Sequence, residues 1–359
     1  MKKLLSVLVI LLFILQQSYS QGCVALKSTG AVCTKNDAGS QATPKGWQLN
    51  TNYRYFKSFR HYREKHEEKE RVEAGTDVRN FSHSLDLTLV RTLNSRWSLG
   101  LNVPLIATRR SSLYEHDGKT RHSTFSFGVG DIRIAAYRWM LNPEKSPKGN
   151  VQLGLGLKLP TGDYKYQDFF YKNDSTKVLG PVDQSIQLGD GGTGLTTEIN
   201  AYYNFSPKVG IYGSFYYLLN PREQNGVSTA RGANPSASNI ANGSYVMSVP
   251  DQYMVRVGAN FTFNKLSVSA GFRNERLPAS DLVGGNNGFR RPGYIISAEP
   301  GLTYNFKKFT AYTYVPFALV RSRIQSEPDK IRSRLAGTRT VGDAAFADYA
   351  VNIGLSFKL

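Results

Sequence analysis

Twelve long segments of alternating polarity, and the way they are connected, constrain the fold of this chain most. We predict strands at 46–58, 79–92, 96–109, 124–139, 150–161, 193–205, 208–220, 251–263, 265–276, 293–306, 308–320 and 346–358. In 150–161, Val151, Leu153, Leu155 and Leu157 alternate with small or polar residues, and a period of two sends successive side chains to opposite faces. These segments match or exceed the length of a tilted membrane strand, whereas strands of soluble proteins are usually shorter.

The connections between these segments alternate between long and short. The long ones are 59–78, 110–123, 162–192, 221–250, 277–292 and 321–345, and the ones between them are tight turns, apart from 141–149. Outer-membrane barrels have short periplasmic turns and longer outer loops, whereas a soluble sandwich has no reason to sort its loops in this way. The sequence therefore predicts an all-β fold, a transmembrane antiparallel up-and-down β-barrel of about twelve strands over 46–359.

Aromatic residues cluster near the ends of the predicted strands, as the interfacial girdles of such a barrel require. They are Trp47, Trp97, Trp139, Phe205, Phe263, Tyr304, Phe306 and Phe357. Strand 124–139 does not keep one phase, because Phe125 and Phe127 share parity with Asp131. A bulge near Gly130 restores the alternation.

The first 45 residues differ from the barrel. Lys2 and Lys3 precede an apolar run, so residues 1–20 form a signal peptide with cleavage near Ser20, and the expected location is the outer membrane of a Gram-negative-type envelope. Residues 21–45 form a periplasmic segment in which Cys23 and Cys33 are expected to pair in a disulfide. The alternative makes Cys23 a lipid-attachment site. No later apolar run is long enough for a transmembrane helix.

The formal charge is +18, but export to the envelope argues against nucleic acid as a partner. We expect outer-membrane lipids as partners, with lipopolysaccharide phosphates bound by basic outer loops, together with a small-molecule solute. The basic residues assigned to these loops are Arg109, Arg110, Lys119, Arg121, Arg290, Arg291, Arg321, Arg323, Lys330, Arg332, Arg334 and Arg339. Merely solvated loops are the competing interpretation. The sequence indicates no oligomeric state.

Three glycine-rich motifs carry a family resemblance. They are Gly-Val-Gly-Asp-Ile at 128–132, Leu-Gly-Leu-Lys-Leu-Pro-Thr-Gly-Asp at 155–163 and Leu-Gly-Asp-Gly-Gly-Thr-Gly at 188–194. With them, the chain resembles the meta-pathway phenol-degradation transporter family of outer-membrane barrels, most clearly over 125–220. The resemblance implies uptake of small, often hydrophobic or aromatic, compounds.

Charged side chains on the polar face of the strands are the candidate lumen residues. By parity they are Arg54, Asp86, Asp131, Arg133, Lys158, Glu198, Arg256, Arg273, Glu275, Glu299 and Asp348. Acids and bases nearly balance, which favours ion pairs across a narrow interior. Two interpretations stay open: a solute path lined by these groups, and a salt-bridged plug that closes the barrel.

The sequence gives little support for catalysis or for metal binding. Ser82 and Ser84 flank His83, but neighbours in a strand point to opposite faces, so neither serine can pass its proton to that imidazole. His61, Glu64, His66, Glu67 and Glu68 lie close in sequence without a recognisable ligand motif. We therefore predict no enzyme, no metal and no cofactor. The expected function is a passive channel for small solutes, and the alternative is a structural or surface-interaction barrel with a closed, ion-paired lumen.

Overall fold

The computed structural model describes residues 46–359, so the predicted signal peptide and the Cys23–Cys33 disulfide lie outside the described residues. Twelve antiparallel strands form one closed sheet, because the last pairs with the first. In order they are β1 (Gly46–Arg63), β3 (Arg79–Thr92), β4 (Trp97–Ser112), β5 (His122–Val129) with β6 (Arg133–Trp139), β7 (Gly149–Lys158), β10 (Gly194–Ser206), β11 (Val209–Leu219), β14 (Gln252–Phe263), β15 (Leu266–Leu277), β16 (Gly293–Asn305), β17 (Phe309–Tyr314) with β18 (Phe317–Arg323), and β19 (Ala344–Lys358). The predicted barrel is confirmed.

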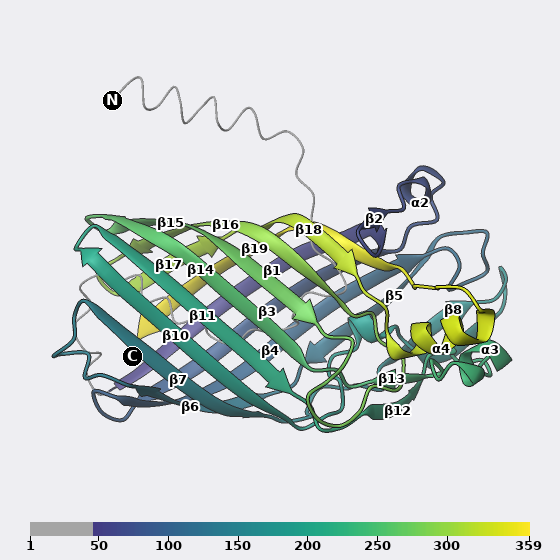
Figure 1. Cartoon of the computed structure of the whole chain (residues 1–359), viewed down its shortest axis with the longest axis horizontal. Coiled ribbons are helices and arrows are strands. Elements are labelled where there is room, and N and C mark those ends of the chain that lie inside the picture. Colours follow the sequence, from purple (N-terminus) through teal and green to yellow (C-terminus); the bar gives the residue numbers. More distant parts are fainter. Residues whose placement is uncertain (1–45) are drawn as a thin grey trace, which may run out of the picture.

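The two ends of the barrel differ, as the alternating connections predicted (Figure 1). Tight turns lie at one end, here called the short-turn end. All the small elements lie at the other, the long-loop end: β2 (His66–Glu67), α2 (Glu70–Glu73), β8 (Gln167–Tyr171), β9 (Lys177–Pro181), η1 (Gln184–Ile186), β12 (Gln224–Ser228), α3 (Ala237–Ala241), β13 (Val246–Ser248) and α4 (Glu327–Ala336). Within 46–359, no helix is long and apolar enough to cross a membrane.

Two of the twelve strands are interrupted. The fourth changes phase between β5 and β6: Phe127 is exposed before the break, while Arg133 is buried and Ile134 exposed after it. The predicted irregularity near Gly130 is thus confirmed. The eleventh strand breaks at 315–316, between β17 and β18, where Pro316 has no N–H to donate to a neighbouring strand.

The phase change corrects one prediction. Trp139 was assigned to an outer girdle, but it is buried, and its ring packs edge-on against Tyr202. Odd-numbered residues face outward in β5. Because the strand changes phase after Val129, odd-numbered residues face inward in β6. Trp47, Trp97, Phe205, Phe263, Tyr304 and Phe306 are exposed.

The outward face carries an apolar band of the thickness that a membrane requires. On β3, Phe81 lies between Lys57 and Arg109 in one cross-strand row near the long loops, and Arg91 pairs with Trp47 in a row near the short turns. The ten residue steps from Phe81 to Arg91 span about 34 Å along a strand, or about 25 Å across a membrane at the usual tilt. Between these rows the outward residues of β3 include Leu85, Leu87 and Leu89.

Tyrosines lie against glycines inside the barrel near the short turns. A Cβ on Gly154 would come within 2.8 Å of the Tyr137 ring, and one on Gly301 within 2.5 Å of the Tyr314 ring. The strands therefore need glycine at these inward positions, because the rings occupy the space that a side chain would fill. Uncharged polar side chains such as Asn102, Gln152 and Asn352 are buried in this region, while the Tyr137 hydroxyl donates to Glu198 and Arg256 lies over the Tyr314 ring.

Candidate functional site: the lumen of the barrel

A chain of ion pairs crosses the lumen at the middle of the barrel. Glu275 on β15 accepts from Arg54 on β1 at 3.2 Å and from Arg273 at 2.9 Å. Arg273 also contacts Glu299 at 3.1 Å, and Glu299 accepts from Arg256 Nε at 2.7 Å. All five side chains are almost fully buried. Since β1 and β15 are not neighbours in the sheet, the Arg54–Glu275 pair joins separate walls of the barrel.

The remaining predicted lumen charges form separate groups. Arg133 pairs with Glu198, which also accepts a hydrogen bond from Tyr137 at 3.1 Å. These contacts pass over β7 at Gly154, where a side chain would obstruct them. Asp348 lies nearer the long loops and pairs with Arg60 and Arg321, each at 3.1 Å. Asp86 is buried on β3, beside β1.

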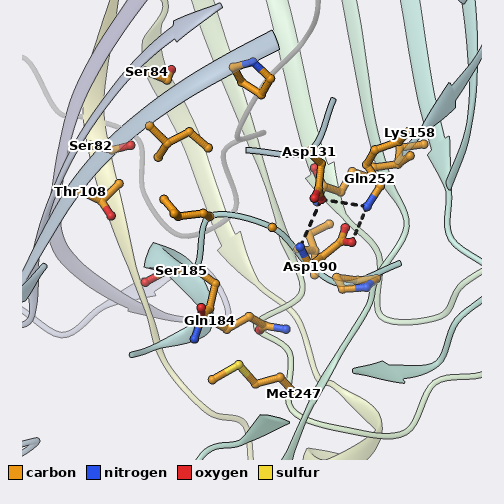
Figure 2. A pocket seen from close by; sticks show the side chains of 18 of the residues that line it. Ser82, Ser84, Thr108, Asp131, Lys158, Gln184, Ser185, Asp190, Met247 and Gln252 are labelled. Atoms are coloured by element: carbon orange, nitrogen blue, oxygen red, sulfur yellow. Dashed lines mark hydrogen bonds and ion pairs between the residues drawn. The ribbon is translucent and has the colours of Figure 1, made fainter. Parts of the chain in front are cut away.

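The three glycine-rich motifs meet around Asp131, in the break between β5 and β6. One carboxylate oxygen accepts from the backbone N–H of Gly162 at 3.0 Å, and the other accepts from that of Asp190 at 3.2 Å. Lys158 lies 3.3 Å from the Asp131 carboxylate and also pairs with Asp190 (Figure 2). A Cβ on Gly189 would lie 2.6 Å from the Gly162 carbonyl oxygen. The glycines thus allow two loop segments to approach one buried carboxylate.

This anchor, defined as Asp131, Lys158 and Asp190, holds residues 183–192 inside the barrel. The segment includes η1, and Ile186, Gln187 and Leu188 are buried. The Ile186 carbonyl accepts hydrogen bonds from Ser126 and Thr108 of the barrel wall. Part of the third long connection is therefore not an outer loop but an inward-folded segment.

An outer cavity of about 130 Å³ lies between the inward-folded segment and the barrel wall. Figure 2 shows its two sides, with Ser82, Ser84 and Thr108 on the wall and Gln184 and Ser185 on the inward-folded segment. Besides polar groups, the lining of this cavity includes the apolar side chains of Phe56, Pro104, Ile106, Leu188, Leu218, Met247 and Leu277. Asp131, Arg133 and Lys158 also line it. The cavity can hold a small molecule that has both apolar and polar parts.

A vestibule of about 240 Å³ lies among the long loops and shares Met247 and Arg291 with the outer cavity. Its cationic lining consists of Arg110, Arg231, Arg290, Arg291, Arg323 and Arg332, against three aspartates, Asp183, Asp329 and Asp343. Asp183 binds Arg291 through two hydrogen bonds of 2.7 and 2.9 Å. Burial alone would raise the pKa of Asp183, but Arg110 and Arg291 hold it well below its usual range.

The cations assigned to the outer loops are largely paired with carboxylates there. Loop carboxylates pair with Arg110, Arg121, Arg290, Arg291, Arg323, Lys330 and Arg339. Burial raises the pKa of Glu115, but Arg110 and Arg231 bring it below the usual value. This end of the molecule is therefore an ion-paired network.

The residues considered as catalytic or metal-binding candidates make other contacts in the structure. His83 is on the outward face, where it bonds Tyr53 at 2.7 Å, while Ser82 and Ser84 line the outer cavity. His61 contacts Asp343 and accepts the backbone N–H of Val78, and Glu68 pairs with Arg63. No group of three or more potential ligands that suits a metal occurs among the residues from 46 onward.

Sequence reasoning missed several lumen residues. Arg60 and Arg321 were not among the inward candidates, because they were assigned to the long connections 59–78 and 321–345, whereas β1 continues to Arg63 and β18 to Arg323. Asp190 stood in a recognised motif but was not assigned a role, since nothing local indicates that its loop turns inward.

Solved structures share this fold. The COG4313 outer membrane channel from Pseudomonas putida F1 superposes with a TM-score of 0.59 at 14% identity, covering 92% of this chain and 100% of that one. The likeness shows that the two proteins share a closed β-barrel fold. The CymD monoaromatic hydrocarbon channel aligns over 95% of this chain and 98% of its own at 9% identity, with a TM-score of 0.43. No family model and no curated protein matches the sequence.

Proposed function

We propose that this protein is an outer-membrane channel through which small solutes pass without an energy source. One observation carries the proposal: the vestibule and the outer cavity lie in sequence within a closed barrel and share Met247 and Arg291 in their walls. A solute that enters among the long loops would reach the outer cavity before it met the layer of mid-lumen ion pairs. The short turns then face the periplasm, as in other bacterial barrels.

The lining of the lumen below the ion pairs supports a wet path. Asn200 and Asn260 lie on the inward side of β10 and β14, and each leaves one amide atom without a hydrogen-bond partner in the protein. Buried amide groups of this kind are normally satisfied by water or by a ligand.

The solute class follows from the mixed lining. The outer cavity combines the Phe56 and Ile106 side chains with serine hydroxyls, and the vestibule above it has twice as many arginines as aspartates. Small organic molecules with an apolar or aromatic body fit this lining, and a carboxylate on them would be attracted by the arginines. The resemblance to the phenol-degradation transporter family points to the same class.

The ion pair between separate walls favours one competing function. Arg54 and Glu275 meet across the lumen, so a barrel that never opens would use them as a brace, and the protein would serve a structural or surface role. Single-channel recording in planar bilayers separates the two. We expect discrete conductance steps after insertion. Silent bilayers that contain correctly folded, inserted protein would contradict the channel proposal and support the brace.

The inward-folded segment gives a second test of the path. In Asp131→Asn, an amide replaces the carboxylate that accepts two backbone N–H groups and pairs with Lys158, so residues 183–192 should leave the lumen more often. We expect a larger conductance and faster tryptic cleavage at Lys165, Lys172 and Lys177. Asp174→Asn, an exposed change in the same connection, should alter neither. Equal conductance of the two variants would show that this segment does not limit the path.

A further inference from the structure

Ten basic side chains surround the short-turn end of the barrel. They are Arg91, Arg96, Arg138, Lys145, Lys148, Lys208, Lys265, Lys307, Lys308 and Lys358, here called the basic rim. The turns and strand ends that carry them contain one carboxylate side chain, Glu144. Among the residues that the structure describes, none of the ten forms an ion pair. The rim therefore carries an uncompensated positive charge, unlike the long-loop end.

The rim lies at a defined membrane depth, because several of its cations adjoin aromatic girdle residues. Arg91 lies over the Trp47 ring at 5.1 Å, and Arg138 over Trp97 at 5.4 Å. The exposed Phe263 precedes Lys265 by two residues, and Phe306 directly precedes Lys307 and Lys308. Girdle aromatics mark the boundary between acyl chains and headgroups. The cations next to them reach the depth of the lipid phosphates, and lysine and arginine stems suit this position.

Nothing inside the barrel attracts these cations away from the membrane. The inward residues near the short turns are uncharged, as Asn150, Gln152, Ser267 and Thr303 illustrate. The charges of the lumen begin about ten residues higher on β1, at Arg54, and they are paired with one another. The field of the rim thus acts on the surrounding headgroups, where unlike charges attract over about a Debye length.

We propose that the basic rim binds anionic phospholipid headgroups of the periplasmic leaflet, and that it holds an annulus of lipids with net negative charge around this end of the barrel. The charge complementarity is specific to lipids that carry a net charge. Phosphatidylcholine has the same phosphate group but a compensating choline, so it gains little from the rim. The proposal depends on the orientation of the barrel and not on whether the lumen conducts.

The test uses full-length protein reconstituted in vesicles of equal parts phosphatidylglycerol and phosphatidylcholine. After mild detergent extraction, native mass spectrometry counts the lipids that remain bound. We expect phosphatidylglycerol to outnumber phosphatidylcholine at least threefold among the lipids that remain bound. The fourfold variant Lys208→Gln, Lys265→Gln, Lys307→Gln and Lys308→Gln should lose most of this preference. Extraction in 1 M salt, where the Debye length falls to about 3 Å, should weaken it as well.

A matched control removes the same charge from the opposite end. Lys65, Lys69, Lys119 and Lys172 are exposed in the long loops, and their change to Gln should leave the lipid preference unchanged. A fourfold Lys→Arg variant of the rim, which keeps the charge, should also retain it. Heat-modifiable migration on gels verifies that each barrel is folded. Equal retention of the two lipids by the wild type, or equal loss of preference in the rim and loop variants, would overturn the proposal.

Discussion

The two halves of the lumen are built from different chemistry. Toward the long loops the interior is charged, and its carboxylates and guanidinium groups are matched, as in the Glu275 and Asp183 pairs. At the short turns the inward residues, such as Gln152 and Ser267, are uncharged, and next to them Tyr137 and Tyr314 pack on glycines and contact the lumen charges Glu198 and Arg256. The outer surface has the reverse arrangement, with unpaired cations at the short turns. The chain thus buries charge only where partners exist, and leaves single charges where headgroups and water solvate them.

The largest expected effect comes from the buried ion pairs at the middle of the lumen. Glu275→Gln removes the charge that Arg54 and Arg273 share at 0% exposure, so Arg54 loses the carboxylate it pairs with and Arg273 is left with Glu299. We expect a loss of about 3 kcal/mol in the free energy of unfolding, measured by urea titration in vesicles with tryptophan fluorescence. Lys208→Gln on the basic rim should change it by less than about 0.5 kcal/mol. Similar losses in both variants would remove the contrast between paired and unpaired charge.

A smaller effect, with a pH signature, is expected in the vestibule. Asp183 has a depressed pKa in the folded state, so its stabilising contribution is present above the unfolded pKa of about 3.9 and is lost as the pH falls below that value. Asp183→Asn should cost about 2 kcal/mol at pH 7 and less under strongly acidic conditions. Unfolding titrations at pH 7 and pH 3 measure the difference. A cost that does not depend on pH would mean that the charge of Asp183 contributes nothing.

The smallest effect concerns the packing of tyrosines on glycines in the lumen. Gly154→Ala places a methyl group 2.8 Å from the Tyr137 ring and 3.1 Å from Glu198 Cβ, and the resulting overpacking should cost roughly 1.5 kcal/mol. Gly213→Ala is the matched control, because its nearest contact would be 3.9 Å away, and it should change stability by less than about 0.5 kcal/mol. Urea titration of both variants checks this. If the two cost the same, the tyrosine–glycine packing is not what stabilises this part of the lumen.

Much of the barrel could be predicted from the sequence, because a period of two assigns each strand residue to a face as long as the register holds. Arg54, Arg133 and Glu275 are buried, while Leu99 and Ile199 are exposed. The method failed where the phase changes and where a strand continues past its predicted end. Trp139 was assigned outward although the bulge before it reverses the parity, and Arg60 was missed because β1 extends beyond the predicted strand end at residue 58.

The candidate site was harder to predict than the wall. The motif around Asp131 was recognised, but its meaning depends on three segments that meet only when the barrel closes and residues 183–192 turn inward. The sequence also could not predict which lumen charges pair with one another, since Arg54 and Glu275 are 221 residues apart in the chain. The near balance of acidic and basic lumen residues predicted ion pairs. The strand order of the barrel decides which residues form them.

Solute entry into proteoliposomes tests the central claim, a continuous path through the barrel, most directly. Vesicles containing the protein should swell in arabinose and not in raffinose, because a twelve-stranded barrel narrowed by residues 183–192 is between a packed eight-stranded barrel and an open porin in width. Asp131→Asn should swell faster than the wild type. If vesicles with verified, folded protein swell no faster in arabinose than empty vesicles, the lumen is not a path and the account is wrong.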